Sequence, residues 1–284
     1  MRHDLSMVMP HIIKTMELSI IITSYKNPEL LQVCIDSIKK NYASDDCEII
    51  VADSATEEKT EIMMREDYPG IKFIASRKNI GFSGTVNNGF AVARGRYLLI
   101  LNGDIIVKKD AIKKLLDYIS NHPDVGIVSP QLLNFNETFQ PSTFRFYTPL
   151  TIVFRRTFLG KFSFAKKHLD RFLMKDFDHK SIRNVDWVMG SSLMTSRQAV
   201  EKVGVMDHQF KLYFEDTDWC RRFWEKGYRV VYFPEAQMYH YHGRGSASGS
   251  VFRALISNKL TWMHIASAIK YFIKYAGKPL PEHN

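Results

Sequence analysis

The stretch Leu18-Ser-Ile-Ile-Ile-Thr-Ser-Tyr-Lys-Asn-Pro-Glu29 joins an apolar run to a polar turn and then to a helix pattern. Its first six residues are mostly apolar and β-branched, which is typical of a strand buried on both faces. Pro28 suits the first turn of a helix, and apolar residues then recur every three or four positions from 30 to 38. The stretch therefore predicts a strand followed directly by a helix.

The same alternation continues through the first half of the chain. Further strands are expected at 47–52, 71–75, 96–101 and 125–129, and helices at 79–93 and 111–119. Strands that alternate with helices indicate an α/β fold with a Rossmann-like, mainly parallel central sheet flanked by helices. Ligands of such sheets bind beyond the carboxyl ends of the strands. Asp53 and Asp104 each follow an expected strand, so we expect both near one ligand site.

The second half is less regular. Residues 134–185 contain two prolines, many aromatic residues and a basic stretch, and they show no clear strand or helix period. Regular patterns return in three places, namely a strand-like segment at 185–194, a helix at 197–203 with Gly204 as its C-cap, and a strand at 228–233. The tail from 251 to 275 predicts an amphipathic helix.

Composition limits the class of protein. The 284 residues are 45% hydrophobic and 24% charged, which is ordinary for a globular chain. The net charge of +9 indicates an anionic partner, which could be nucleic acid, a phosphorylated substrate or an acidic membrane surface. Three scattered cysteines fit reduced thiols in the cytoplasm. We expect neither a secretion signal nor a membrane-spanning helix, because no apolar run is long enough.

Three carboxylates open one helix pattern. Glu215, Asp216 and Asp218 lie in the segment Leu212-Tyr-Phe-Glu-Asp-Thr-Asp-Trp-Cys-Arg-Arg222. The helix dipole favours acids in a first turn, which would explain one or two of them without any function. A carboxylate pressed against aromatic rings can instead have a raised pKa, as a general base working near pH 7 requires. These residues alone leave both interpretations open.

Two short patterns could bind a metal ion. Asn102-Gly-Asp104 ends an expected buried strand, where a carboxylate could hold Mg²⁺ or Mn²⁺ against a diphosphate, although Asn-Gly is also a common turn. His240-Tyr-His242 places two imidazoles on one side of an extended chain, and one of them could be a further ligand. The alternative is that both are ordinary surface or core-edge histidines.

Two other segments are candidates for binding. The glycines of Asn79-Ile-Gly-Phe-Ser-Gly84 match no phosphate-binding loop, so they predict a tight turn, with Asn79 left as a polar contact. The segment 154–175 interleaves cations with phenylalanines, which suits lipid headgroups or an acceptor's phosphate, nucleic acid, or a solvated basic surface. The tail helix could likewise face a membrane or a second copy of the chain in a homodimer.

Three segments together resemble the family 2 glycosyltransferases, which are inverting enzymes with the GT-A fold. These segments are residues 18–29 with Ile49-Ile-Val-Ala-Asp-Ser54, residues 79–84 with 93–104, and residues 190–194 with 203–222. Within that family the chain is most similar to bacterial rhamnosyltransferases of surface polysaccharide synthesis. The resemblance covers residues 18 to 246.

The resemblance implies a role for each matching residue. Asp216 matches the catalytic base, and Asp104 matches the metal-binding acid, with His240 or, failing that, His242 completing the metal site. The other matches are catalytic support by Glu215, Asp218 and Arg222, nucleotide binding by Thr23, Tyr25, Asp53, Asn79 and Asn102, and acceptor binding by Trp187, Gly190 and Ser191.

The chain departs from the family pattern at three positions. Asn102 opens the D-x-D motif, which leaves one acid there, Ser54 stands in place of the usual Asn, and Lys26 replaces a more usual Asn or Asp. None of these changes removes an essential acid. An inactive relative is therefore disfavoured, as is a purely nucleotide-sugar-binding or membrane-binding module. A nucleotidyltransferase should carry a glycine-rich turn after Thr23, and this chain has none.

The resemblance and the residues together predict an activity. We expect transfer of a sugar, with L-rhamnose from dTDP-L-rhamnose first and UDP-sugars second, to a hydroxyl of a glycan or polyprenyl-diphosphate-linked acceptor. Mn²⁺ or Mg²⁺ is the expected cofactor, and no nucleic acid is involved. The expected location is the cytoplasm, peripheral to the inner face of the plasma membrane.

We also expect one catalytic domain at 18–250. It would comprise a nucleotide-sugar half at 18–133 and an acceptor half at 134–250, between an N-terminal extension at 1–17 and a helical tail at 251–284.

Overall fold

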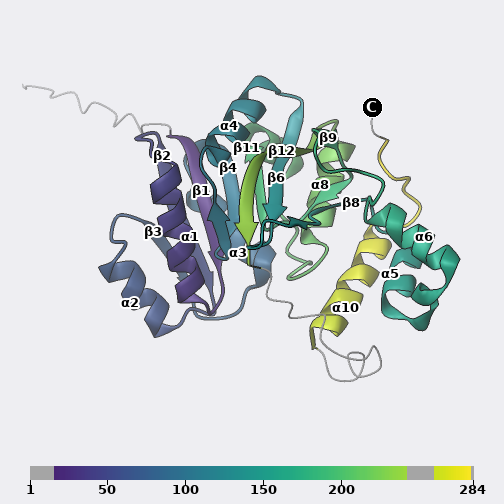
Figure 1. Cartoon of the computed structure of the whole chain (residues 1–284). Coiled ribbons are helices and arrows are strands. Elements are labelled where there is room, and N and C mark those ends of the chain that lie inside the picture. The colour runs from purple at the N-terminus through teal and green to yellow at the C-terminus, as the bar shows by residue number, and fades with distance from the viewer. Residues whose placement is uncertain (1–15, 242–258, 283–284) are drawn as a thin grey trace, which may run out of the picture.

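The structure, a computed structural model, describes residues 16–241 and 259–282. A mixed sheet crosses the molecule, and helices cover both of its faces (Figure 1). Its strands are β1 (Met16–Ser24), β2 (Cys47–Ser54), β3 (Lys72–Ser76), β4 (Gly95–Asn102), β5 (Ile105–Val107), β6 (Val125–Leu133), β7 (Phe139–Gln140), β9 (Arg183–Asn184), β11 (Ser192–Ser196) and β12 (Arg229–His240). A separate small sheet pairs β8 (Thr143–Phe144) with β10 (Trp187–Val188).

The main sheet is mainly parallel, as the sequence predicts. Its strand order is β3-β2-β1-β4-β11-β6-β12-β5, and in addition β7 pairs with β6 and β9 pairs with β12. The first four strands in this order are parallel to one another, and β6 is parallel to β12. Strand β11 runs antiparallel between β4 and β6, and β5 runs antiparallel to β12. The short strands β7 and β9 also pair antiparallel, with β6 and β12, so antiparallel strands complete a mainly parallel α/β sheet.

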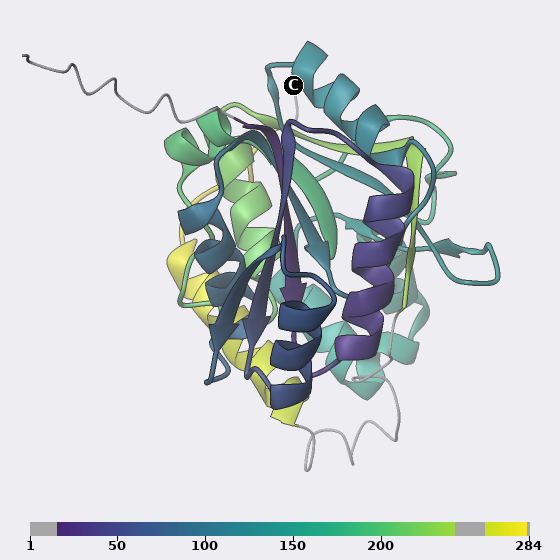
Figure 2. The ribbon, with the colours of Figure 1, turned by 90° about the vertical axis from the view of Figure 1, so that its left-hand side faces the viewer.

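The helices divide between the two faces of the sheet (Figure 2). They are α1 (Pro28–Asn41), α2 (Glu58–Glu66), α3 (Gly81–Val92), α4 (Ala111–Asn121), α5 (Pro149–Arg156), η1 (Phe158–Lys161), α6 (Ser163–Phe172), α7 (Arg197–Val203), α8 (Glu215–Glu225) and α10 (Lys259–Lys274). Side chains alternate along a strand, so β1 serves both faces. Ile20 packs in one core with α1 and α4, whereas Ile21 packs in the other core with α3 and α8.

The prediction of irregular structure at 134–185 was wrong in part. Helices α5 and α6 both lie in this segment, beside α10 and away from the β3 edge of the sheet (Figure 1). Each buries only a narrow side, through Phe154 in α5 and through Ala165 and Phe172 in α6. Both helices are short, and the segment around them is rich in aromatic and basic residues, so the sequence pattern missed both.

Other expectations are confirmed with shifted boundaries. Pro28 begins α1, and Gly204 caps α7 at a φ of 89°. The strand expected at 228–233 continues to His240, which brings this histidine to the end of β12. The expected tail helix is α10, and the part of that expectation at 251–258 lies outside the described residues, as do residues 1–15 of the expected N-terminal extension.

The strand register aligns the polar residues at the carboxyl ends. Ser24 of β1 pairs with Asp53 of β2, and Thr23 of β1 pairs with Asn102 of β4. Asp53 and Asp104 therefore flank the end of the same central strand, as their positions after buried strands predict. This shared edge is where the candidate site lies.

Candidate active site

A cavity of about 680 Å³ opens at the carboxyl ends of β1, β2 and β4. Five residues predicted to contact the donor or the metal line it, namely Thr23, Tyr25, Asn79, Asn102 and Asp104. Side chains that the sequence did not single out complete the wall: Ser24, Ser54, Phe82, Lys211, Leu260 and Met263. Leu260 and Met263 belong to α10, so the C-terminal helix helps to form the cavity. Its volume is in the usual range of small-molecule sites.

Asp53 lies beneath this cavity and does not form its surface. Its side chain is 1% exposed, and neither carboxylate oxygen has a well-formed hydrogen bond with residues 16–241 or 259–282. Burial raises the pKa of Asp53, while the nearby hydroxyls of Thr56 and Ser24 partly offset this rise. An unpartnered buried carboxylate is costly unless a ligand satisfies it. Asp53 is therefore suited to accept hydrogen bonds from a bound molecule.

The ends of β1 and β4 are fixed by hydrogen bonds to each other and to β11. Thr23 Oγ1 donates to Asn102 Oδ1 at 3.1 Å, and the Gly103 N–H donates to the Thr23 carbonyl at 2.8 Å. The Asn102 N–H donates to the carbonyl of Ser191, also at 2.8 Å. Asn102 thus joins the expected nucleotide side of the site to the segment that begins with Gly190.

Asp104 and His240 come together because β5 pairs with β12. This pairing places His240 opposite Ile105, the residue after Asp104. His240 Nε2 then lies 3.5 Å from Asp104 Oδ1, a buried oxygen that accepts no hydrogen bond from the described residues. On the other side of the ring, Nδ1 donates to Gln140 Oε1 at 2.7 Å. Gln140 is itself held by Asn134 Oδ1, which accepts from its amide nitrogen at 3.2 Å.

These contacts suit a divalent cation that is shared with a substrate. Among the described residues, no three His, Cys, Asp or Glu side chains cluster as a metal cage. Asp104 and His240 could provide two ligands, and phosphate oxygens and water commonly complete such sites. Metal-binding histidines usually donate their second N–H to an outer partner, and Gln140 is placed to be that partner. His242, the alternative ligand, lies outside the described residues.

Asp216 is held in position by two backbone groups. The Gly190 N–H donates to Oδ2 at 3.1 Å, and the Thr217 N–H donates to Oδ1 at 2.7 Å. A Cβ at Gly190 would lie 2.9 Å from the ring of Phe82, which lines the cavity, and 3.5 Å from the Asp216 Cβ. The backbone of Gly190 therefore lies between Asp216 and the cavity wall at Phe82.

Burial changes the acidity of the two neighbouring carboxyl groups. It raises the pKa of Asp216 to about 6, although the hydrogen bonds from Gly190 and Thr217 act in the opposite direction. Burial, and then the charge of Asp216, raise the pKa of Glu215 well above its usual value. Asp216 keeps partial exposure while Glu215 is buried. Asp216 is therefore the carboxylate of this pair that is placed to take up a proton near pH 7.

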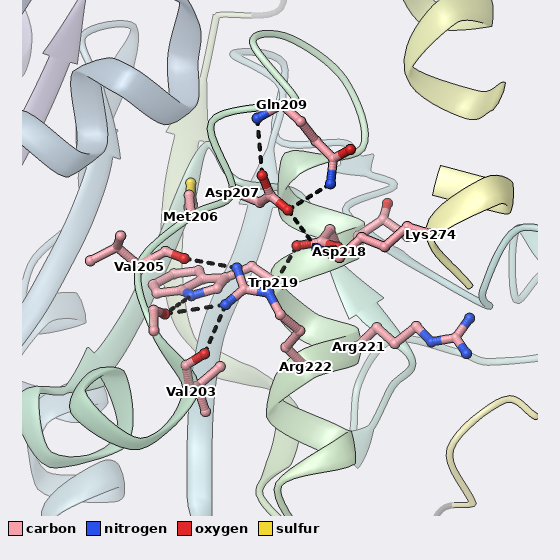
Figure 3. Close-up of polar contacts among 12 residues, drawn as sticks. Val203, Val205, Met206, Asp207, Gln209, Asp218, Trp219, Arg221, Arg222 and Lys274 are labelled. Carbon is pink, nitrogen blue, oxygen red and sulfur yellow. Dashed lines mark hydrogen bonds and ion pairs between the residues drawn. The ribbon is translucent and has the colours of Figure 1, made fainter. Parts of the chain in front are cut away.

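Asp218 and Arg222 stabilise the position of α8, the helix that carries Asp216. Asp218 is fully buried and accepts from Arg222 Nε at 2.9 Å, from Lys274 Nζ at 2.6 Å and from the Tyr275 hydroxyl at 2.8 Å (Figure 3). Arg222 also donates to the carbonyls of residues 203–205. Lys274 and Tyr275 belong to the C-terminal helix and its end, so Asp218 ties α8 to the tail. Of the three residues predicted to support catalysis, Asp218 and Arg222 hold the helix in place, and neither forms a hydrogen bond or ion pair with Asp216 in the described structure.

The expected acceptor residues have different surroundings. Trp187 is 6% exposed, stacks on Phe144 at 4.5 Å and donates from its indole to the Arg145 carbonyl at 2.8 Å. The buried Ser191 hydroxyl has no hydrogen-bond partner among the described residues. Only Gly190 touches Asp216. Trp187 is thus packed among Phe144 and Tyr147 and does not line the cavity, whereas the Ser191 hydroxyl is available for a polar contact.

The sequence pattern missed the backbone that presents Asp216. Tyr213 and Phe214 both adopt left-handed conformations, with φ of 68° and 71°. Such conformations are costly for bulky residues and persist only where neighbours enforce them. The Lys211 carbonyl accepts from the Phe82 N–H, and the Leu212 carbonyl accepts from Ser267 of α10. The loop before α8 is thereby fixed between α3 and α10.

Comparison with known proteins identifies the family of the chain. Residues 19–204 match the family described as "Glycosyl transferase family 2". The N-acetylglucosaminyl-diphospho-decaprenol L-rhamnosyltransferase of Mycobacterium tuberculosis is 23% identical over 77% of this chain and 74% of its own length. The rhamnosyltransferase WbbL of Escherichia coli K12 is 24% identical over 90% of this chain and 92% of its own length.

Solved structures share the fold. The mannosyltransferase PcManGT of Pyrobaculum calidifontis, in complex with GDP-Man and Mn²⁺, superposes with a TM-score of 0.56 at 17% identity, over 93% of this chain and 76% of that one. GalNAc-T7 with UDP, GalNAc and Mn²⁺ gives a TM-score of 0.61 at 14% identity, over 83% of this chain but only 45% of that one.

The sheet, its helices and these structural likenesses define the GT-A fold. The chain belongs to glycosyl transferase family 2 and is similar to rhamnosyltransferases within it.

Proposed function

We propose that the chain is an inverting, metal-dependent enzyme that transfers L-rhamnose from dTDP-L-rhamnose. The acceptor is a hydroxyl of a glycan or polyprenyl-diphosphate-linked glycan used in surface polysaccharide synthesis. One observation carries the proposal: the Asp216 carboxylate is held by the Gly190 N–H, directly behind the wall of the cavity that Asp104 also lines. This arrangement supports the proposal because it would bring a base and a diphosphate-anchoring acid to one site.

Different residues of the site bind the nucleotide and the cation. Asp53 accepts hydrogen bonds from the nucleotide. The nucleotide is surrounded in the cavity by Thr23, Tyr25, Asn79 and Asn102. Asp104 and His240 would hold a divalent cation, which when bound offsets the negative charge on the departing nucleoside diphosphate. Lys211, an exposed cation in the cavity wall, adds positive charge there.

Asp216 acts on the acceptor. Its carboxylate takes the proton of the acceptor hydroxyl while the oxygen forms a bond to the anomeric carbon. The bond from that carbon to the diphosphate oxygen breaks, and its electron pair leaves with the diphosphate. Attack from the face opposite the leaving group inverts the configuration. A pKa near 6 leaves Asp216 mostly ionised at pH 7 and still basic enough to accept a proton.

The choice of donor and acceptor rests on the relatives' names. Two relatives are named as rhamnosyltransferases, and one of these names an N-acetylglucosaminyl-diphospho-decaprenol acceptor. UDP-sugars are the second candidate donors. No helix in the described parts of the chain is long and apolar enough to cross a membrane. We propose peripheral contact with the inner face of the plasma membrane and keep the expected division into an N-terminal nucleotide half and a later acceptor half.

Thermal unfolding in the presence of nucleotides tests this proposal. A ligand that binds only the folded state raises the melting temperature according to its occupancy. We expect a Mn²⁺-dependent rise with dTDP and dTDP-L-rhamnose that exceeds the rise with UDP, GDP and their sugars. A larger rise with UDP species would replace the rhamnose assignment with a UDP-sugar. No rise with any nucleotide at millimolar concentration would contradict the nucleotide-sugar site.

A further inference from the structure

Two adjacent arginines end α5 without an acidic partner. Arg155 donates from Nη1 to the Tyr147 hydroxyl at 2.9 Å, and its guanidinium lies 5.5 Å from the ring centre of Phe172. Arg156 is half-buried and has no hydrogen bond or ion pair with any residue in the described ranges. Burial and the charge of Arg155 both lower the pKa of Arg156. Basic residues suit the last turn of a helix, yet two uncompensated charges at close range repel each other.

The pair lies next to the catalytic loop. The ring of Tyr147, which anchors Arg155, is 4.6 Å from the ring of Phe214, the residue before Glu215 and Asp216. His264 of α10 packs against Phe214 at 5.3 Å and against Tyr213 at 5.1 Å. Burial, with help from Arg156 and Arg155, lowers the pKa of His264 to about 3, so this ring adds no charge. Arg155 and Arg156 therefore place positive charge beside Tyr147 and His264, which pack against the loop before Asp216.

An exposed apolar surface adjoins the arginine pair. Its members, on α5, η1 and α6, are Leu150 (55% exposed), Val153 (39%), Phe158 (68%), Phe162 (49%) and Phe164 (62%). The Phe162 and Phe164 rings stack at 5.8 Å. A cationic pair between a catalytic carboxylate and an apolar surface matches a molecule with a sugar at one end, phosphate in the middle and a hydrocarbon chain at the other end.

We propose that Arg155 and Arg156 form a subsite for the diphosphate of a lipid-diphosphate-linked acceptor, and so present its sugar hydroxyl to Asp216. This inference rests on the proposed transfer reaction and names the part of the acceptor that the enzyme recognises. A diphosphate esterified at both ends carries two negative charges, which two guanidinium groups can offset through charge-assisted hydrogen bonds. The hydrocarbon chain would then extend over Phe158, Phe162 and Phe164.

Binding of farnesyl diphosphate tests the subsite. Calorimetry would be done with saturating dTDP and Mn²⁺, so that the donor site cannot take the probe, and farnesol would serve as the uncharged comparison. We expect Arg156→Gln to weaken farnesyl diphosphate binding by about tenfold or more and to leave farnesol binding unchanged. Because Arg156 makes no hydrogen bond or ion pair with the described residues, the variant should fold normally. Arg171→Gln, an exposed position on α6, is the control of equal charge change.

The outcomes separate the sources of phosphate. Equal farnesyl diphosphate affinity for wild type, Arg156→Gln and Arg171→Gln would overturn the subsite. So would a defect of Arg156→Gln that appears only in binding to vesicles of anionic phospholipid, because that result assigns the arginine to membrane headgroups. Failure of the proposed function is distinct: the nucleotide-dependent rise in melting temperature would then be absent from wild type itself. A retained rise with unchanged farnesyl diphosphate affinity would reject only the subsite.

Discussion

The backbone N–H of Gly190 donates a hydrogen bond to Oδ2 of Asp216 at 3.1 Å, and the same glycine has no room for a side chain. A Cβ there would lie 2.9 Å from Phe82 and 3.5 Å from the Asp216 Cβ. This packing fixes where the carboxylate meets the cavity. It also gives a direct way to displace the carboxylate without removing it.

Gly190→Ala should lower the turnover number by roughly 100-fold, because a displacement of about 1 Å at a catalytic group can cost that much. The melting temperature should fall by only a few degrees. Steady-state rates and thermal unfolding would be measured together. Gly70→Ala is the matched control, because a Cβ at Gly70 meets nothing within 4 Å. Equal turnover in the two variants would show that the position of Gly190 has no bearing on Asp216.

Glu215→Gln should change how stability depends on pH. The raised pKa keeps Glu215 protonated in the folded protein at pH values where the unfolded chain releases the proton. Wild-type stability therefore contains a contribution that is complete at low pH and is lost as pH rises through the folded pKa. The variant lacks this contribution. We therefore expect the melting temperature of Glu215→Gln to rise relative to that of wild type as the pH increases from 5 to 8. Melting temperatures of the two proteins that change in parallel with pH would contradict the raised pKa of Glu215.

Gln140→Leu should weaken metal binding without touching either proposed ligand. Loss of an outer partner of a metal-binding histidine typically costs about 10-fold to 100-fold in affinity. Mn²⁺ affinity would be measured by electron paramagnetic resonance with dTDP present. Gln237→Leu, which removes an amide on β12 that donates to Gln131, is the control. An unchanged Mn²⁺ affinity in Gln140→Leu would separate the Gln140–His240 contact from the metal site.

Lys274→Met should destabilise the protein by about 2 kcal/mol, since it removes hydrogen bonds between charged groups and leaves the fully buried Asp218 with fewer partners. Chemical denaturation would measure the loss. Lys270→Met, on the same helix, removes only a bond to the Gln209 carbonyl and should cost less than about 0.5 kcal/mol. Equal effects would mean that α10 is not held through Asp218.

Positions after buried strands could be predicted well from the sequence. Asp53 and Asp104 follow apolar, β-branched runs, and the parallel register then brings both to the end of β1. The cluster at 215–218 stood out as a candidate because three acids precede an aromatic helix, whereas the resemblance to the family selected Asp216 as the predicted base. In each case the deciding pattern is local, so a few neighbouring residues were sufficient.

Partners distant in sequence could not be predicted in this way. Gln140 reaches His240 across 100 residues, and Lys274 reaches Asp218 across 56. Such contacts depend on which strands pair and where the C-terminal helix lies, and neither leaves a periodic signal. The sequence of the acids at 215–218 gave no sign that Asp218 anchors α10 while Asp216 lies behind the cavity wall.

The central claim is that Asp216 is the base and that the cavity holds the donor. Asp216→Asn tests it most directly, with donor affinity and transfer rate measured on the same sample and Asp117→Asn as an exposed control. We expect transfer to fall by roughly 10²-fold to 10⁴-fold while dTDP-sugar affinity stays within about twofold of wild type. Transfer at the wild-type rate by Asp216→Asn would contradict the assignment of the base.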